Sequence, residues 1–159
     1  MVLIGIKETD SEEEADYLLN KLLKMRIFPD EEGKMNKSVQ DVDGELLLIS
    51  QFTLYSSHKK HRPSFHKAMN FKDAEKLYDY FCEKSREHIK TETGMFGEYM
   101  DVKLVNDGPV TIVIEKDNHN FFDIENFTKK TSQRIIFENI VFFCLYVFFF
   151  KTHTLYYMI

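Results

Sequence analysis

The stretch Glu45-Leu-Leu-Leu-Ile-Ser-Gln-Phe-Thr-Leu-Tyr55 carries the strongest strand pattern in the 159-residue chain. Its first half, Leu46–Ile49, is apolar at every position, which is typical of a strand buried on both faces. A period of two residues places Gln51 and Thr53 on one face of the predicted strand, and each face turns from aliphatic to polar toward its end. We therefore expect a central strand whose last residues reach an open edge of the sheet.

Two amphipathic helices flank this strand in the sequence. Residues 11–26 carry leucines at helical spacing behind the capping pattern Asp10–Glu13, and Phe71–Ile89 has an apolar face with the same spacing. Tyr99–Val105 and Val110–Glu115 alternate as two strands of a hairpin. With a short strand at its start, the chain is predicted to form an α+β domain with the helices packed on a mostly antiparallel sheet.

Composition excludes several classes of protein. The formal net charge is −5 and the pI is about 5.7, so the chain has no polybasic coat for nucleic acid, although a local basic patch remains possible. Two cysteines are too few for a disulfide framework or a four-cysteine zinc site. The first apolar run is too short for a signal peptide, so we expect a cytoplasmic protein.

The end of the central strand, Ser50-Gln51-Phe52-Thr53, is the first candidate site. Polar side chains and backbone N–H groups at a strand end can hold the carbonyl or oxyanion of a ligand, and the alternative is a strand that simply reaches solvent. The sequence has no Gly-x-Ser-x-Gly elbow and no glycine-rich phosphate loop, and Cys82 falls on an apolar helix face. An enzyme built from this chain would act mainly through positioning and backbone donors.

Two further stretches could carry chemistry. The basic run His58-Lys59-Lys60-His61-Arg62 suits phosphate oxygens, with a solvated surface loop as the alternative. A zinc site on His58, His61 and His66 would lack a nearby thiolate or carboxylate, so we expect no metal. Asn106-Asp-Gly-Pro109 has the composition of a tight turn, and sequence alone does not predict a cis bond before its proline.

Six short stretches, taken in order, resemble the D-aminoacyl-tRNA deacylase family over about residues 1–116. They are Leu23-Lys-Met-Arg-Ile-Phe28, Glu32-Gly-Lys-Met-Asn36, Ser50-Gln-Phe-Thr-Leu-Tyr55, Arg62-Pro-Ser-Phe65, Gly94-Met-Phe-Gly97 with Met100, and Val105-Asn-Asp-Gly-Pro-Val-Thr111. The resemblance implies a homodimeric, barrel-like fold without cofactors in a domain spanning residues 1–117. It also implies hydrolysis of the ester that joins a D-amino acid, or glycine, to the 3′-terminal adenosine of tRNA.

The resemblance further implies roles for single residues. Ser50, Gln51, Phe52 and Thr53 would line the catalytic site, with backbone donors at Phe52 and Thr53 holding the aminoacyl group. Thr53 is the family's candidate nucleophile, yet assistance from the 2′-hydroxyl of the RNA fits better with the absence of a nearby base.

Selection and tRNA binding fall to other positions in the family. Gly108 and Pro109 match its Gly-cis-Pro motif, which enters the site of the partner subunit and excludes L-amino acids by crowding. Apolar residues near the adenine would be Phe96 and Met100. Phosphate contacts are expected from the basic loop, at Lys59, Lys60 and Arg62.

Two features depart from the family pattern. Family members begin with a further β-hairpin, including an arginine that supports the Gly-Pro loop, and this sequence shows no counterpart before Val2–Ile6. Residues 118–159 match nothing in the family, and nine of the fifteen phenylalanines lie from His119 onward. We expect this tail to lie outside the domain. An inactive truncated family member that keeps a dimer or tRNA-binding surface is the alternative function.

The tail also raises a membrane alternative. Its apolar run, Ile140–Phe150, would rise about 16 Å as a helix, against about 30 Å for the hydrocarbon core of a bilayer. We therefore do not expect a membrane partner.

Overall fold

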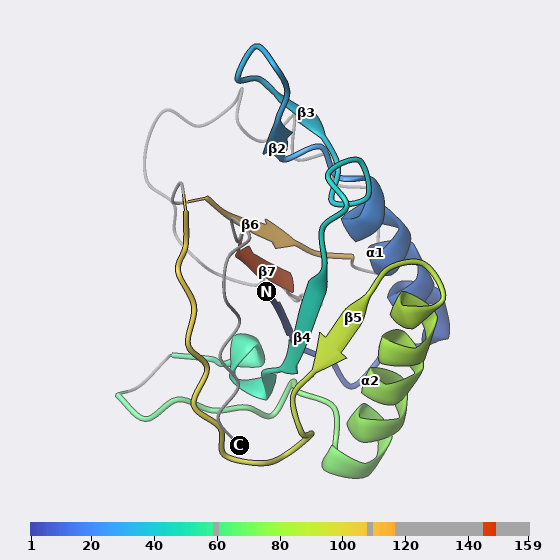
Figure 1. The fold of residues 1–159 in the computed structure, drawn as a ribbon. Coiled ribbons are helices and arrows are strands. Elements are labelled where there is room, and N and C mark those ends of the chain that lie inside the picture. The colour runs from blue at the N-terminus through green and yellow to red at the C-terminus, as the bar shows by residue number, and fades with distance from the viewer. Residues whose placement is uncertain (59–60, 108–109, 117–144, 149–159) are drawn as a thin grey trace, which may run out of the picture.

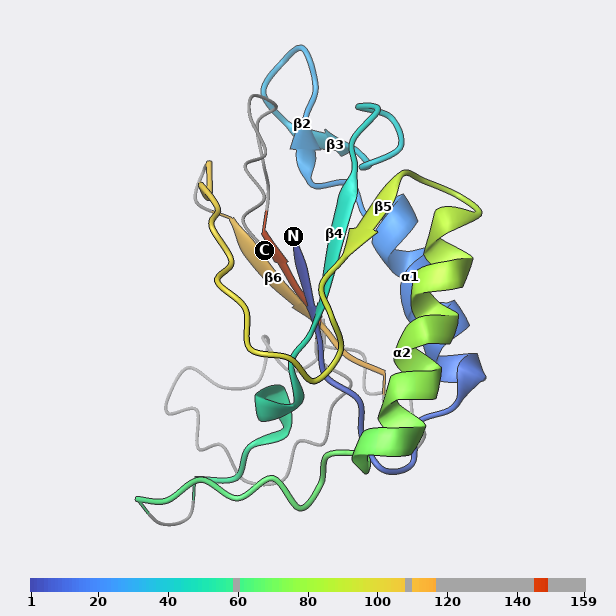
Figure 2. The ribbon, with the colours of Figure 1, turned by 60° about the horizontal axis from the view of Figure 1, so that its bottom comes forward.

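The structure, a computed structural model, describes residues 1–58, 61–107, 110–116 and 145–148. Two helices lie side by side along one flank of a five-stranded sheet, and a small two-stranded hairpin projects from one end (Figures 1 and 2). The predicted α+β class with two amphipathic helices is confirmed.

Helix α1, Glu12–Lys24, begins at a capping box. The N-cap is Ser11, whose backbone N–H and hydroxyl both donate to the Glu14 carboxylate, at 2.8 and 2.6 Å. The predicted cap at Asp10 is therefore one residue early, because the Asp10 carboxylate accepts instead from the backbone N–H of Lys7. The buried apolar face follows the leucine pattern, with Ala15, Leu18, Leu19, Leu22 and Leu23.

Helix α2, Phe71–Arg86, begins at Asn70, whose side chain accepts a hydrogen bond from the backbone N–H of Asp73. Its buried face is the predicted one: Ala74, Leu77, Tyr78, Phe81, Cys82 and Ser85. The two helices pack against each other, and the Tyr80 hydroxyl on α2 donates to the Asp16 carboxylate on α1 at 2.9 Å.

The large sheet has the strand order β5-β4-β1-β7-β6. Its strands are β1 (Val2–Ile4), β4 (Leu46–Ser50), β5 (Thr91–Thr93), β6 (Thr111–Ile114) and β7 (Leu145–Phe148). Strand β4 runs parallel to both β1 and β5, whereas β7 is antiparallel to β1 and β6. The expectation of a mostly antiparallel sheet is thus wrong, because α1 and α2 each act as a crossover that returns the chain in the same direction.

The predicted hairpin of Tyr99–Val105 with Val110–Glu115 does not form. Residues 99–105 run as an extended segment without a strand assignment, and β6 pairs with β7 instead. The Val110 N–H donates to Asn106 Oδ1 at 3.4 Å, and residues 108 and 109 between them lie outside the described residues.

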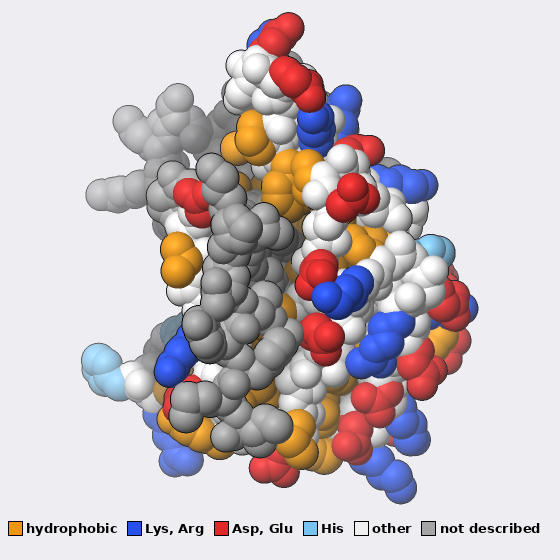
Figure 3. Space-filling view, in the orientation of Figure 1, with side chains coloured by type: hydrophobic (Ala, Val, Ile, Leu, Met, Phe, Trp, Pro, Cys, Tyr) orange, Lys and Arg blue, Asp and Glu red, His pale blue; other side chains and the backbone are white. Residues whose placement is uncertain are grey.

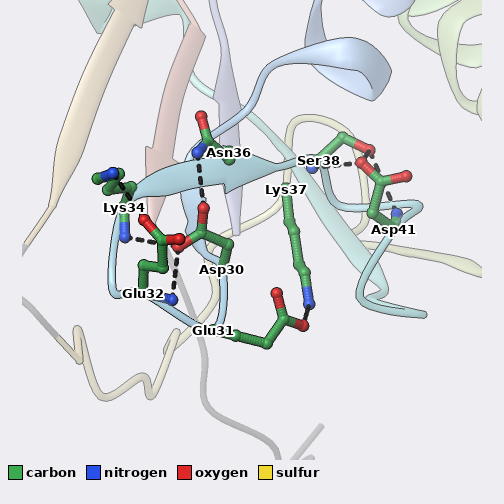
Figure 4. A network of polar contacts seen from close by, with 8 residues as sticks. All are labelled: Asp30, Glu31, Glu32, Lys34, Asn36, Lys37, Ser38 and Asp41. Atoms are coloured by element: carbon green, nitrogen blue, oxygen red, sulfur yellow. Dashed lines mark hydrogen bonds and ion pairs between the residues drawn. The ribbon is translucent and has the colours of Figure 1, made fainter.

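The projecting hairpin consists of β2 (Phe28–Pro29) and β3 (Met35–Lys37), joined by a charged turn. The Asp30 carboxylate accepts from the backbone N–H groups of Glu32 and Lys34, both at 2.9 Å, which fixes the turn (Figure 4). Ion pairs link Lys34 to Glu32 and Lys37 to Glu31. These charged side chains therefore pair with one another and stabilise the hairpin itself.

Of the tail predicted to lie outside the domain, residues 118–159, the structure describes only β7, which pairs with β1 and β6. The rest of the tail lies outside the described residues, and the domain boundary at residue 117 stays a prediction. In the part of the chain that the structure describes, no helix has the length and apolar character needed to cross a membrane.

Candidate active site

The central strand ends earlier than its sequence pattern predicts. Strand β4 stops at Ser50, and Phe52–Tyr55 forms a turn of 3₁₀ helix, η1. Gln51 joins them, and its backbone N–H donates to the carbonyl of Ile4 at 2.7 Å. The strict alternation of side chains expected through Tyr55 is therefore wrong beyond Gln51.

The 3₁₀ turn Phe52–Tyr55 leaves backbone N–H groups available as donors at the end of β4. The first hydrogen bond of the turn runs from the Leu54 N–H to the Gln51 carbonyl at 3.2 Å. The N–H groups of Phe52 and Thr53 precede that bond, so the turn itself provides them with no acceptor. Two successive amide donors at the end of a buried strand can hold a carbonyl oxygen or an oxyanion.

The side chains of Gln51 and Thr53 contact each other. Gln51 Nε2 donates to Thr53 Oγ1 at 2.6 Å, and both residues are half-buried. An amide has no basic lone pair, so this partner orients the threonine hydroxyl without removing its proton. The pair therefore suits positioning better than activation of a nucleophile.

Phe52 stands out of the turn with 55% of its surface exposed. Its ring meets that of Phe65 edge to face, with centroids 5.0 Å apart. Phe65 follows the basic hairpin, which closes through two backbone hydrogen bonds between Ser57 and Ser64. The aromatic pair thus joins the strand end to the residue that directly follows the loop carrying the cationic residues.

The loop after β5 forms the other side of the site. Leu48 on β4 accepts two hydrogen bonds at its carbonyl, from the Gly94 N–H at 3.0 Å and the Tyr78 hydroxyl at 2.8 Å. A Cβ added at Gly94 would lie 2.7 Å from Met100 Sδ and 2.9 Å from Ile49 Cδ1. Met100 therefore lies close to β4. The strand residue nearest to it in this contact is Ile49, which directly precedes the Ser50–Thr53 segment.

Phe96 lies between two other aromatic rings. Its centroid is 5.1 Å from that of Phe71 and 5.5 Å from that of Tyr78. Sequence analysis identified Phe96 and Met100 but missed the residues that hold them. The signal for Tyr78 was its place on the buried face of α2, where a phenol needs a hydrogen-bond acceptor.

Of the remaining predicted site residues, the structure describes only Arg62. Arg62 is exposed in the loop that closes between Ser57 and Ser64. Lys59, Lys60, Gly108 and Pro109 lie outside the described residues. The structure thus brings Gln51 and Thr53 into contact at the end of β4, places Met100 beside Gly94, and packs Phe96 against Phe71 and Tyr78. The roles of all the predicted site residues stay predictions.

Other chemistry is poorly supported among the described residues. Burial raises the pKa of the Cys82 thiol to about 11, which makes it a weak nucleophile. No group of three metal-ligating side chains occurs within the described ranges. A hollow of about 490 Å³ between α1 and α2 is lined by residues such as Asp16, Tyr80 and His88, none of which belongs to η1 or the Gly94–Met100 loop.

Acidic and basic side chains are interspersed on the flank formed by the helices (Figure 3). Hydrophobic side chains show both along the lower edge of this view and below the projecting hairpin. Among the described residues, Tyr99 and Val105 are 95% and 76% exposed, and both belong to the extended segment that leads to β6.

The chain is similar to known hydrolases of aminoacyl-tRNA. The family model described as D-Tyr-tRNA(Tyr) deacylase matches residues 1–115. A protein of Thermosipho melanesiensis named D-aminoacyl-tRNA deacylase is 49% identical over 118 residues, covering 72% of this chain and 79% of the relative. One from Clostridium acetobutylicum with the same name is 52% identical over 115 residues, covering 71% and 77%.

Two solved structures share the fold. A chain described as c-Myc DNA Unwinding Element Binding Protein has a TM-score of 0.69 at 42% identity and covers 72% of this chain and 80% of its own length. A probable eukaryotic D-amino acid tRNA deacylase has a TM-score of 0.52 at 18% identity, covering 61% and 74%, and this likeness concerns the fold alone.

The chain combines a mixed α+β fold with two successive backbone donors at the end of a buried strand. With the family match spanning residues 1–115, the chain belongs to the D-Tyr-tRNA(Tyr) deacylase family.

Proposed function

We propose that the protein hydrolyses the ester between a D-amino acid, or glycine, and the 3′-terminal adenosine of tRNA, and that it spares L-aminoacyl-tRNA. The observation that carries the proposal is about 50% identity to relatives named D-aminoacyl-tRNA deacylase, over a span that includes η1 and the Gly94–Met100 loop. The same identity favours an active hydrolase over the inactive alternative.

In this proposal the N–H groups of Phe52 and Thr53 bind the ester carbonyl and stabilise the charge that develops on its oxygen. Such donors act strongly because they are already oriented before reaction. Thr53, held by Gln51 at 2.6 Å, orients the aminoacyl group. The nucleophilic water is assisted by the 2′-hydroxyl of the adenosine, since the amide of Gln51 cannot take a proton.

The adenosine lies on the apolar side of the site. Phe96 and Met100 pack against the adenine, a mode in which a base gains stacking energy without a sequence-specific hydrogen bond. Lys59, Lys60 and Arg62 contact phosphates of the acceptor end. Only the end of the tRNA enters, which is compatible with an acidic chain.

Chiral selection in this proposal needs a second subunit. Gly108 and Pro109 of one protomer enter the site of its partner, in the cis form, and crowd out an L side chain. Exposed apolar side chains at Tyr99 and Val105, on the segment that leads to this turn, support a homodimer interface there. Barrel-like closure of the sheet and a cytoplasmic location, where aminoacyl-tRNA is used, belong to the same proposal.

Two measurements on the full chain test the activity. Labelled D-tyrosyl-tRNA is incubated with excess protein, and release of the amino acid is followed while binding of the same tRNA is measured by filter retention. Release well above the spontaneous rate is expected. Binding without release would instead support the inactive alternative, and neither binding nor release would reject the family's activity for this chain.

A further inference from the structure

The first residue of helix α2 is a phenylalanine that is exposed but closely contacted. Phe71 has 61% of its surface exposed, and its ring meets Phe96 edge to face, at 5.1 Å between centroids and 72° between planes. Asn70, the residue before Phe71, caps the helix and fixes the backbone of Phe71. Together with the contact to Phe96, this cap holds the exposed ring in place at the surface.

The loop that carries Phe96 also approaches this ring. Gly97 has a φ of +74°, and a Cβ added there would lie 2.7 Å from Phe71 Cζ. Only glycine combines this backbone conformation with the close approach to the ring. The contact therefore depends on the Phe71 ring from the helix and on the missing side chain of Gly97 from the loop.

Phe96 is also contacted by Tyr78, at 5.5 Å between centroids and 44° between planes. The Tyr78 hydroxyl is in turn bonded to the Leu48 carbonyl on β4. A continuous set of contacts therefore runs from the central strand through Tyr78 and Phe96 to Phe71. In this set Tyr78 is the buried neighbour of Phe96 and Phe71 is its exposed neighbour.

We propose that Phe71 is a positioning residue of the adenosine site: it holds the Phe96 ring in the orientation that binds the base. This inference rests on the proposed function. Without Phe71, the Phe96 ring keeps its contact with Tyr78 but loses one of its two aromatic neighbours, so substrate binding weakens while the chemical step at η1 is unaffected. An edge-to-face pair is worth a roughly three- to tenfold change in an equilibrium constant.

Phe71→Ala, Phe71→Tyr and Gly97→Ala are compared with wild type for KM and kcat on D-tyrosyl-tRNA and on the minimal ester 3′-O-D-tyrosyl-adenosine. Phe71→Ala is expected to raise KM by about three- to tenfold on both substrates, with kcat within twofold. Phe71→Tyr keeps the ring and restores the wild-type KM. Gly97→Ala displaces the same ring and raises KM likewise without altering Phe71.

Tyr17→Ala is the matched control, because Tyr17 is also an exposed aromatic residue on a helix, 42% exposed on α1. It should leave both kinetic constants unchanged. An unchanged KM in Phe71→Ala, or a change in kcat alone, overturns the inference. A KM effect on the tRNA but not on the adenosine ester overturns it too, because Phe71 would then contact another nucleotide. An inactive wild type would instead refute the proposed function.

Discussion

The hydroxyl of Tyr78 on α2 donates a 2.8 Å hydrogen bond to the carbonyl of Leu48 at the centre of β4. The same carbonyl accepts from the N–H of Gly94, at the start of the Gly94–Met100 loop. One backbone oxygen thus joins the helix, the central strand and the loop. Burial also raises the pKa of Tyr78, which keeps this donor protonated.

Tyr78→Phe removes this buried bond and should lower the free energy of unfolding by about 0.5–1.5 kcal/mol, because Leu48 keeps its bond from Gly94. Urea unfolding measures the change. Tyr80→Phe is the control, since the Tyr80 hydroxyl bonds to Asp16 at 2.9 Å in an exposed position. A cost for Tyr80→Phe as large as that for Tyr78→Phe would contradict the structural role of the Leu48 carbonyl.

Thr53→Val should slow hydrolysis by no more than about tenfold, the effect of one lost hydrogen bond. The reason is that Gln51 Nε2 only donates to Thr53 Oγ1 and cannot activate it. Single-turnover deacylation of D-tyrosyl-tRNA gives the rate, and Thr93→Val on β5 serves as the control. Complete loss of activity in a folded Thr53→Val protein would instead identify Thr53 as the nucleophile.

Gly94→Ala should raise KM for D-tyrosyl-tRNA several-fold and lower the melting temperature. The added methyl group would lie 2.7 Å from Met100 Sδ and 2.9 Å from Ile49 Cδ1, so the loop must move away from β4. Gly33→Asn is the comparison, because Gly33 lies in the remote hairpin turn and asparagine tolerates its positive φ of 77°. If Gly94→Ala leaves KM at the wild-type value, Met100 does not bind the adenosine.

Glu115 gives a prediction on pH. Burial raises the pKa of its carboxyl from 4.5 to about 8, so the folded state holds the proton more tightly than the unfolded state. Its contribution to stability is complete below about pH 4.5 and is lost as the pH rises toward 8. Glu115→Gln should therefore raise the melting temperature at pH 8.5 and change it little at pH 4.5.

Melting curves at the two pH values measure the effect, with Glu92→Gln on β5 as the control for removing an exposed carboxylate. An equal gain at both pH values would show that protonation of Glu115 is not the cause.

Local pattern was sufficient for the helices and for the start of the central strand. Leucine spacing predicted the buried face of α1, and the run Leu46–Ile49 is the buried part of β4. Pattern failed beyond Gln51, where the strand makes its last ladder bond to Ile4 and a 3₁₀ turn replaces the expected continuation. The ladder partner lies 47 positions earlier in the chain, so alternation within the strand does not show where the pairing ends.

The pairing of the strands could not be predicted from local sequence either. The alternation of Tyr99–Val105 fits a strand, but a strand needs a partner, and β6 pairs with β7 across a long stretch of sequence. The residues of the site could be named from the family resemblance. What holds them, including Tyr78, Phe71 and Gly97, depends on contacts between helix and loop that periodicity does not encode.

The most direct test of the central claim is the ratio of single-turnover rate constants on D-tyrosyl-tRNA and L-tyrosyl-tRNA, made from the same tRNA and measured with the same preparation of the full chain. A chirality-selective deacylase releases D-tyrosine rapidly and releases L-tyrosine only at the rate of the ester alone in buffer. Equal enzymatic rates on both esters would contradict the central claim.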